Sequence, residues 1–255
     1  MARSLISLHY RFELARLGYP IDDIQYCLSF SQGDGMAFYG RISSLDTICQ
    51  RLLADSDDQC NLALSALTKG MYLDISRCNW SYRYNHFNTM MVLVSNESFP
   101  ETISEEETNA VELLRQRISE DIKEVSKQLE LAGYHIIDAT PYEKKVVREF
   151  CTKQFKVKIE EHPESELILD HWDDSEIEPI IQDIVNGKKR YFRVIVEVQS
   201  REYGQLLGHN SLGSIIDNID YPSRSYHGYK DELIANSIDE ARKAIEELSK
   251  CNVAA

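Results

Sequence analysis

The chain changes direction at Ser31-Gln32-Gly33-Asp34-Gly35, between two segments in which apolar and polar residues alternate. The apolar positions of one face are Ile24, Tyr26, Leu28 and Phe30 before the turn, and Met36, Phe38, Gly40 and Ile42 after it. A period of two on both sides of a glycine-rich turn predicts a β-hairpin with one buried face. Because both turn glycines can adopt positive φ, the motif has two interpretations: simple turn chemistry, or a recognition tip that presents Gln32 and Asp34.

Residues 1–160 are expected to form an α+β domain, because helical periods alternate with hairpins. The expected elements are a helix over 4–17, helices that begin after Ser44 and near Leu62, a second hairpin with strands 72–82 and 89–94, a long helix over 104–133, a helix over 142–151 and a strand over 155–159. Ser104 and Glu107 form a capping box at the start of the long helix. Apolar residues then recur every 3.6 residues until Gly133.

The acidic residues of the chain are concentrated in one segment. The chain of 255 residues has a net charge of −14 at pH 7, and the segment 161–187 contains nine acidic residues and no Lys or Arg. With two prolines, this composition predicts a linker between the first domain and a second one over 188–255. The segment is either a solvated spacer or an acidic surface that imitates the phosphate spacing of nucleic acid. Its predicted contact residues are Asp170, Trp172, Asp173 and Asp174.

The second domain is expected to contain a strand over 191–198, a stretch interrupted by Gly204, Gly208 and Gly213, and a helix over 229–250. Apolar residues follow one side of that helix, so it should pack on the apolar face of the strand. The predicted fold class is therefore α+β, with two small mixed domains in which antiparallel hairpins pack on helices, joined by the acidic linker.

The turn motif, together with Phe38 and Gly40, resembles the Ser-Gln-Gly-Asp-Gly-x-x-Phe signature of a poorly characterised family encoded by phages, prophages and plasmids. Its members are often labelled antitoxin-like. The resemblance covers roughly residues 20–160, and it departs where the family often has Gly-His-Tyr, because this chain has Trp80-Ser81-Tyr82. In the second domain, Leu207–Ile215 resembles a Leu-Gly-x-x-Ser-Leu-Gly-x-Ile stretch of small phage proteins. The resemblance implies an accessory protein of a mobile element.

Composition and motifs argue against several classes of function. The six cysteines include no Cys-x-x-Cys pair, as a zinc ribbon would need, and no phosphate loop or dinucleotide motif occurs. No apolar stretch is long enough to cross a membrane, and no signal-peptide pattern is seen, so we expect a cytoplasmic protein. The compact basic cluster Lys188-Lys189-Arg190 adjoins the acidic segment, so we expect no direct contact with nucleic acid.

An enzyme is the alternative that the residues leave open. Asp34 and His86, brought together at neighbouring hairpin turns with Asp74 or Asn88, would suit a small metal- or acid/base-dependent hydrolase. No recognised catalytic motif accompanies them. We therefore expect a protein without cofactor or resident metal.

The favoured hypothesis is inhibition by binding. The polar hairpin residues Gln32, Asp34, His86 and Asn88 and the acidic segment would contact a host or competing-element protein with a basic surface, such as a defence or toxin component. Assembly into a homo-oligomer through the exposed half of the long helix is left open.

Overall fold

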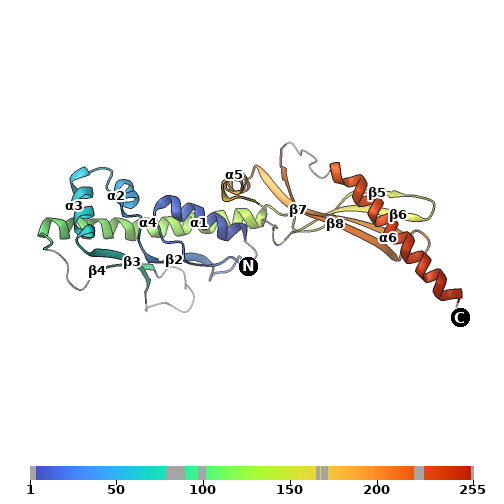
Figure 1. Cartoon of the computed structure of the whole chain (residues 1–255), viewed down its shortest axis with the longest axis horizontal. Coiled ribbons are helices and arrows are strands. Elements are labelled where there is room, and N and C mark those ends of the chain that lie inside the picture. Colours follow the sequence, from blue (N-terminus) through green and yellow to red (C-terminus); the bar gives the residue numbers. More distant parts are fainter. Residues whose placement is uncertain are drawn as a thin grey trace. The chain divides into compact units, whose positions relative to one another are not determined.

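The computed structural model describes residues 4–78, 90–96, 102–164, 167, 172–220 and 227–253, without side-chain detail for 227 and 248–253. The chain is an α+β protein with two four-stranded antiparallel sheets. It divides into two compact units, and the boundary lies within a long helix, between Tyr134 and His135. We call them the N-terminal and the C-terminal unit (Figure 1).

The N-terminal unit has a meander sheet with strand order β1-β2-β3-β4. Its elements are α1 (Leu5–Leu17), β1 (Asp23–Cys27), β2 (Gly35–Arg41), α2 (Leu45–Leu52), α3 (Asp57–Thr68), β3 (Met71–Arg77), β4 (Met90–Asn96) and α4 (Glu105–Asp138), of which the last crosses the boundary. The predicted hairpin is the β1–β2 pair, in which Cys27 lies opposite Gly35 and Asp23 opposite Tyr39. The predicted connection between β3 and β4 lies outside the described residues.

The helices of the N-terminal unit lie on one face of its sheet (Figure 1). The inward residues of the strands, among them Met36, Phe38 and Ile75, form one core with the apolar stripe of α4. Each of these three side chains is fully or almost fully buried, so the hydrophobic effect holds helix to sheet. The opposite face of the sheet carries polar residues such as Asp74 and Ser76 and apolar ones such as Met91 and Leu93.

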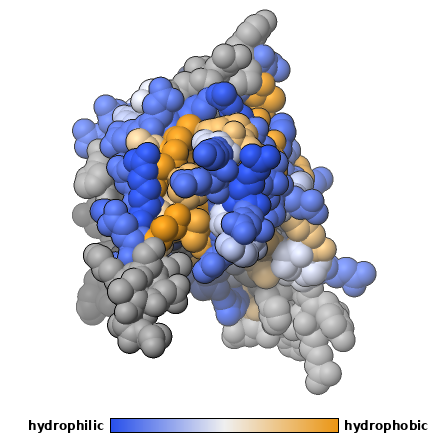
Figure 2. All heavy atoms as spheres, turned by 90° about the vertical axis from the view of Figure 1, so that its right-hand side faces the viewer, coloured by the Kyte–Doolittle hydropathy of each residue, from blue (hydrophilic) through white to orange (hydrophobic). Residues whose placement is uncertain are grey.

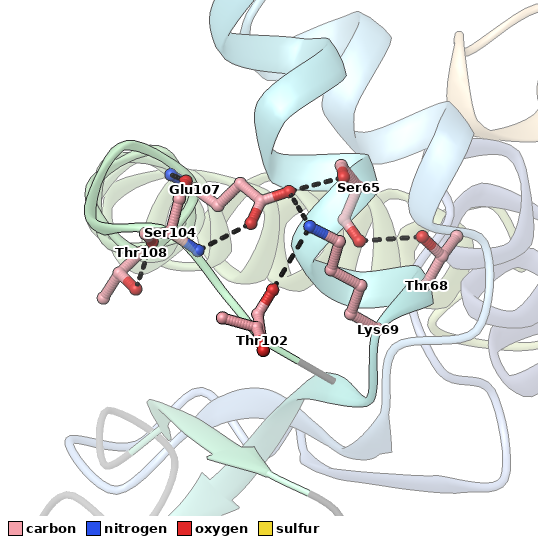
Figure 3. A network of polar contacts seen from close by, with 7 residues as sticks. All are labelled: Ser65, Thr68, Lys69, Thr102, Ser104, Glu107 and Thr108. Atoms are coloured by element: carbon pink, nitrogen blue, oxygen red, sulfur yellow. Dashed lines mark hydrogen bonds and ion pairs between the residues drawn. The ribbon is translucent and has the colours of Figure 1, made fainter. Parts of the chain in front are cut away.

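The predicted capping box begins α4 as expected. The backbone N–H of Ser104 donates to Glu107 Oε2 (2.8 Å), and the backbone N–H of Glu107 donates to Ser104 Oγ (3.1 Å). Figure 3 shows that the same carboxylate also meets α3, because Ser65 Oγ and Lys69 Nζ each lie 2.6 Å from Glu107 Oε1. Together these contacts lower the pKa of Glu107 to about 2, and the hydrogen bond from Lys69 makes the largest contribution. A local sequence motif thus fixes α4 against α3 as well.

The expectation that the long helix ends near Gly133 is wrong, because α4 continues to Asp138. A Cβ at position 133 would overlap the Tyr10 hydroxyl and, at 2.5 Å, Leu28 Cδ1. Gly133 therefore serves close packing in the middle of a helical turn and does not end the helix.

The C-terminal unit has a second meander sheet, with strand order β5-β6-β7-β8. Its elements are β5 (Lys145–Cys151), β6 (Phe155–His162), α5 (Asp174–Val185), β7 (Lys189–Ser200), β8 (Leu206–Asn218) and α6 (His227–Val253). As predicted, the last helix packs on the apolar face: Leu233 and Ala241 share a core with Val196 and Val198. The Ser237 hydroxyl also bonds to the Val196 carbonyl oxygen at 3.3 Å.

Two glycines of the stretch that resembles phage proteins have packing roles. A Cβ at Gly208 would overlap the backbone of α6 at Ser237 and Ala241, so only glycine lets the helix approach β8. A Cβ at Gly213 would lie 2.6 Å from Glu164 Oε1. The spacing of these glycines therefore reports the packing of β8 and not a ligand loop.

The predicted domain boundaries need correction. Residues 145–160, assigned by sequence to the first domain, belong to β5 and β6, and β6 pairs with β7 along its whole length. The segment over 142–151 is a strand and not a helix, since Lys145-Val146-Val147 begins a hairpin that turns at Thr152. Valines favour the extended conformation, which decides this short segment.

The predicted linker 161–187 is largely folded. Its first residues close the sheet: Glu161 and Glu164 are buried and pair with Arg190 (2.9 Å) and Arg193 (3.1 Å). Its second half is α5, in which three of the four isoleucines are buried. These are Ile177, Ile181 and Ile184. Their helical spacing is present in the sequence, but the high average content of acidic residues in the segment led to the prediction of a linker.

Candidate functional site

Asp34, predicted at the tip of the hairpin, turns inward and braces the turn. Its Oδ1 accepts hydrogen bonds from the hydroxyls of Ser29 (2.7 Å) and Ser31 (3.0 Å). Its Oδ2 accepts from the backbone N–H groups of Ser29 (2.6 Å) and Ser31 (2.9 Å), and from the Tyr134 hydroxyl on α4. Both carboxylate oxygens are therefore occupied by the turn and by α4.

These contacts fix the charge state of Asp34. Partial burial alone would raise its pKa, but the hydrogen bonds from Tyr134, Ser29 and Ser31 outweigh burial and hold the pKa well below the usual carboxyl range. Burial, followed by the bond to Asp34, raises the pKa of Tyr134 to about 12. Asp34 is thus a permanent anion at neutral pH, suited to organising the loop rather than to transferring protons.

Phe30 is the unexpected residue of this turn. The sequence placed it on the buried face of the first strand, but β1 ends at Cys27 and Phe30 is 63% exposed. Its φ is +58°, a left-handed conformation that costs a bulky residue of the order of 1 kcal/mol. Its ring lies against Tyr134, with 4.6 Å between the ring centroids. The turn therefore holds an aromatic side chain in solvent at a cost to folding.

The other predicted hairpin residues have mixed outcomes. Gln32 is exposed in the turn, two residues after Phe30 in the sequence. His86 and Asn88 lie outside the described residues, as does Asp170. The pairing of Asp34 with His86 that an enzyme would need stays a prediction.

The remaining predicted contact residues lie at the start of α5 in the C-terminal unit. Trp172 is 40% exposed, and Asp173 and Asp174 are exposed as well. The Asp173 carbonyl oxygen accepts the backbone N–H groups of Glu176 (2.9 Å) and Ile177 (3.1 Å), which begins the helix. Acidic residues in the first helical turn are favoured by the helix dipole, so these carboxylates also have a structural role.

The outer face of the C-terminal unit offers no broad apolar surface in the view of Figure 2. The exposed apolar residues of the C-terminal unit include Val146, Val147, Leu206 and Ile245. Figure 2 shows a narrow band of hydrophobic side chains between hydrophilic ones. We therefore place no candidate site on that face.

A hollow that the sequence did not predict lies on the outer face of the N-terminal sheet. It measures about 540 Å³ and is lined by residues of β1, β2 and β3, with Asp22 just before β1. Its carboxylates come from Asp22, Asp23 and Asp74, of which only Asp74 was considered from the sequence, as a partner of Asp34 and His86. Strand alternation and pairing place Asp23 and Asp74 on one face of the sheet, a signal that could have found these two.

Comparison with known protein families, curated proteins and solved structures finds no match to this chain. Within the described residues, no group of three or more His, Cys, Asp or Glu is placed to hold a metal ion. No described helix has both the length and the apolar character needed to cross a membrane. The function has to be argued from the chain's own residues.

Proposed function

We propose that this chain is an accessory protein of a phage or another mobile element, and that it binds and inhibits a host defence or toxin protein in the cytoplasm. The observation that carries the proposal is Phe30, an exposed aromatic residue in a left-handed conformation on a braced turn. The sequence resemblance supplies the class of protein.

The physical case rests on preorganisation. Aromatic residues dominate the energetics of protein interfaces, and a side chain held in its bound conformation loses little entropy on association. Asp34 fixes the backbone at Ser29 and Ser31, on both sides of Phe30, and Tyr134 supports the ring. Strained residues that the surrounding structure holds in place are typical of functional sites. The exposed Gln32, two residues after Phe30, would add a polar contact.

The acidic residues at the start of α5 support a basic partner. Asp173 and Asp174 are exposed beside Trp172, as a surface that attracts a basic protein would require. Such charges act mainly on the rate of association and lose their effect at high salt.

The test uses Phe30→Asn, because asparagine adopts positive φ readily and removes only the aromatic side chain. Tyr203→Asn is the matched control, since Tyr203 is a turn aromatic of the C-terminal unit that is 77% exposed. Wild type and both variants are used to capture partners from lysates that carry defence and toxin systems. The recovered partner is then purified, and its affinity and activity are measured at low and high salt.

We expect Phe30→Asn to weaken binding by about 2 kcal/mol, or roughly 30-fold in Kd, and to relieve inhibition, with Tyr203→Asn unchanged. Equal binding by wild type and Phe30→Asn would refute the role of the turn. A partner whose activity is unaffected by saturating wild-type protein would refute inhibition.

A further inference from the structure

The hollow on the outer face of the N-terminal sheet exists because two strands diverge. β1 pairs with β2 at five positions, whereas β2 pairs with β3 at two, Gly40 with Ile75 and Arg41 with Asp74. Beyond them, the Phe38 backbone N–H donates to the Met90 sulfur at 3.4 Å, a weak acceptor. The opening between the strands leaves a polar space of about 540 Å³, within the usual range for binding sites.

The hollow carries an excess of negative charge. Of the lining residues, Asp22, Asp23 and Asp74 are acidic and Arg77 is basic, while Arg41, opposite Asp74 in the β2–β3 pairing, lies over the Tyr72 ring. Arg77 is engaged, because its guanidinium donates to Gln25 Oε1 and lies over the Tyr39 ring, 5.3 Å from its centroid. The described residues provide no hydrogen bond or ion pair to the carboxylates of Asp22 and Asp74. Two carboxylates are therefore available to a ligand.

A second observation points to a ligand in the same hollow. Tyr39 belongs to the lining and is only 8% exposed, and it is also a member of the hydrophobic core of this unit. Its hydroxyl is buried and has no hydrogen-bond partner among the described residues. A buried hydroxyl without a partner is unfavourable, and such groups in a native fold are rare. A ligand that hydrogen-bonds this oxygen would relieve the penalty.

The rim of the hollow suggests what carries the ligand group. Met91 lies opposite Ser76, and Leu93 opposite Asp74, so both β4 side chains border the hollow on the same sheet face. They are 38% and 39% exposed. An apolar rim beside an acidic hollow suits a peptide segment that places one basic side chain in the hollow and an apolar neighbour on the rim.

We propose that this hollow binds the guanidinium group of an arginine side chain presented by a peptide segment. A guanidinium is planar and has five N–H donors, so one group can bond to carboxylates from different strands and to the Tyr39 oxygen. An ammonium is more strongly hydrated and lacks the planar arrangement of donors. The inference relies on the proposed function only for the source of the arginine, because the guanidinium site stands on the hollow's own residues.

The experiment measures binding of a synthetic peptide, Leu-Arg-Leu with blocked ends, to the full chain by calorimetry. Peptides with lysine or the uncharged isostere citrulline in place of arginine test the chemistry, and agmatine tests a free small molecule. The variants are Asp74→Asn and Tyr39→Phe. Asp220→Asn, at an exposed aspartate of the C-terminal unit, is the control for net charge.

We expect the arginine peptide to bind at least about tenfold more tightly than the lysine and citrulline peptides and than agmatine. Asp74→Asn should lose about tenfold in affinity and Asp220→Asn none. Tyr39→Phe should weaken binding yet raise the melting temperature of the free protein, because it removes the unpartnered hydroxyl.

Equal binding of the arginine and citrulline peptides, full affinity in Asp74→Asn, or no binding at all would overturn the proposal. Agmatine bound as tightly as the peptide would refute the role of the rim and assign the hollow to a free small cation. The peptide is synthetic, and Phe30 is not among the residues that line the hollow. A peptide that does not bind would therefore refute the guanidinium site and leave the proposed inhibition untested, and a failed inhibition test would leave the guanidinium site standing.

Discussion

Two hairpin turns of this protein perform the same task in different ways. In the C-terminal unit, β7 and β8 are joined by a turn whose positive φ of +68° belongs to Gly204, which adopts it without steric cost. In the N-terminal unit, the positive φ between β1 and β2 belongs to Phe30, a residue that adopts it rarely. The first turn closes with bonds of Ser200, and the second needs an aspartate that accepts from five donors.

The difference separates folding from function. A β-hairpin turn that needs a positive φ can place a glycine there without strain, as Gly204 does in the same chain. The additional bonds around Asp34 offset the strain at Phe30, and neither would be necessary if the turn only reversed the chain. Tyr203, exposed beside Gly204, has an unstrained backbone by comparison, since its φ is not positive. The proposed binding role of Phe30 would account for the difference, because it needs the ring held in a fixed position.

Replacing Asp34 should give the largest effect. Asp34→Ala leaves the backbone N–H groups of Ser29 and Ser31 and the Tyr134 hydroxyl without their acceptor, so the turn should open. Hydrogen exchange measured on peptides that cover 23–41 should accelerate by roughly tenfold or more, while peptides that cover 189–218 keep their rates.

Ser200→Ala provides the comparison in the other turn. It removes one acceptor, the hydroxyl that bonds to the Tyr203 N–H at 3.2 Å, and should cost no more than about 1 kcal/mol. If both substitutions accelerate exchange equally, Asp34 is an ordinary turn residue and the contrast between the turns fails.

Acid should weaken the N-terminal turn selectively. The folded-state pKa of Asp34 lies below its unfolded value, so its charge contributes stability that is complete above about pH 4 and is lost as the pH falls through the lowered pKa. Asp34→Asn lacks this titration. The melting temperatures of wild type and Asp34→Asn should therefore differ most near neutral pH and converge in strong acid.

The melting temperatures of wild type and Asp34→Asn must be compared at each pH, because Glu107 also has a lowered pKa, of about 2. Protonation of Glu107 destabilises both proteins in acid, and this effect cancels in the difference between them. Curves that stay parallel from pH 7 to pH 2.5 would show that the charge of Asp34 does not stabilise the turn.

The sequence predicted those features that depend on neighbours along the chain. The capping box at Ser104 and Glu107 and the alternation around Asp34 are local patterns, and the structure contains both. The contact of Asp34 with Tyr134 joins residues far apart in the sequence, so no local pattern could reveal it. For the same reason the sequence could not show that Phe30 leaves the strand, because its conformation depends on that distant support.

The errors in the C-terminal unit have a compositional cause. Residues 161–187 were predicted as a linker because charge was averaged over a segment in which Glu161 and Glu164 are buried partners of arginines. The pairing of β6 with β7 connects residues on both sides of that segment, and a single sequence gives no register for such pairing. The acidic hollow was missed because it is formed by three strands, each of which contributes one or two polar positions.

The substitutions with the smallest expected effect test the comparison most directly. They remove the glycine from the position with positive φ in one turn and introduce a glycine at that position in the other. Gly204→Ala should destabilise the protein by about 1 kcal/mol, because no atom lies within 4 Å of the new Cβ and the cost is conformational alone. Phe30→Gly relieves a similar strain but loses the contact with Tyr134 and gains entropy in the unfolded state, so its net effect should stay within about 1 kcal/mol. Denaturant unfolding of wild type and both variants measures the change in the free energy of unfolding for each substitution. If Phe30→Gly costs clearly more than Gly204→Ala, Phe30 is retained for folding, and its exposure needs no partner to explain it.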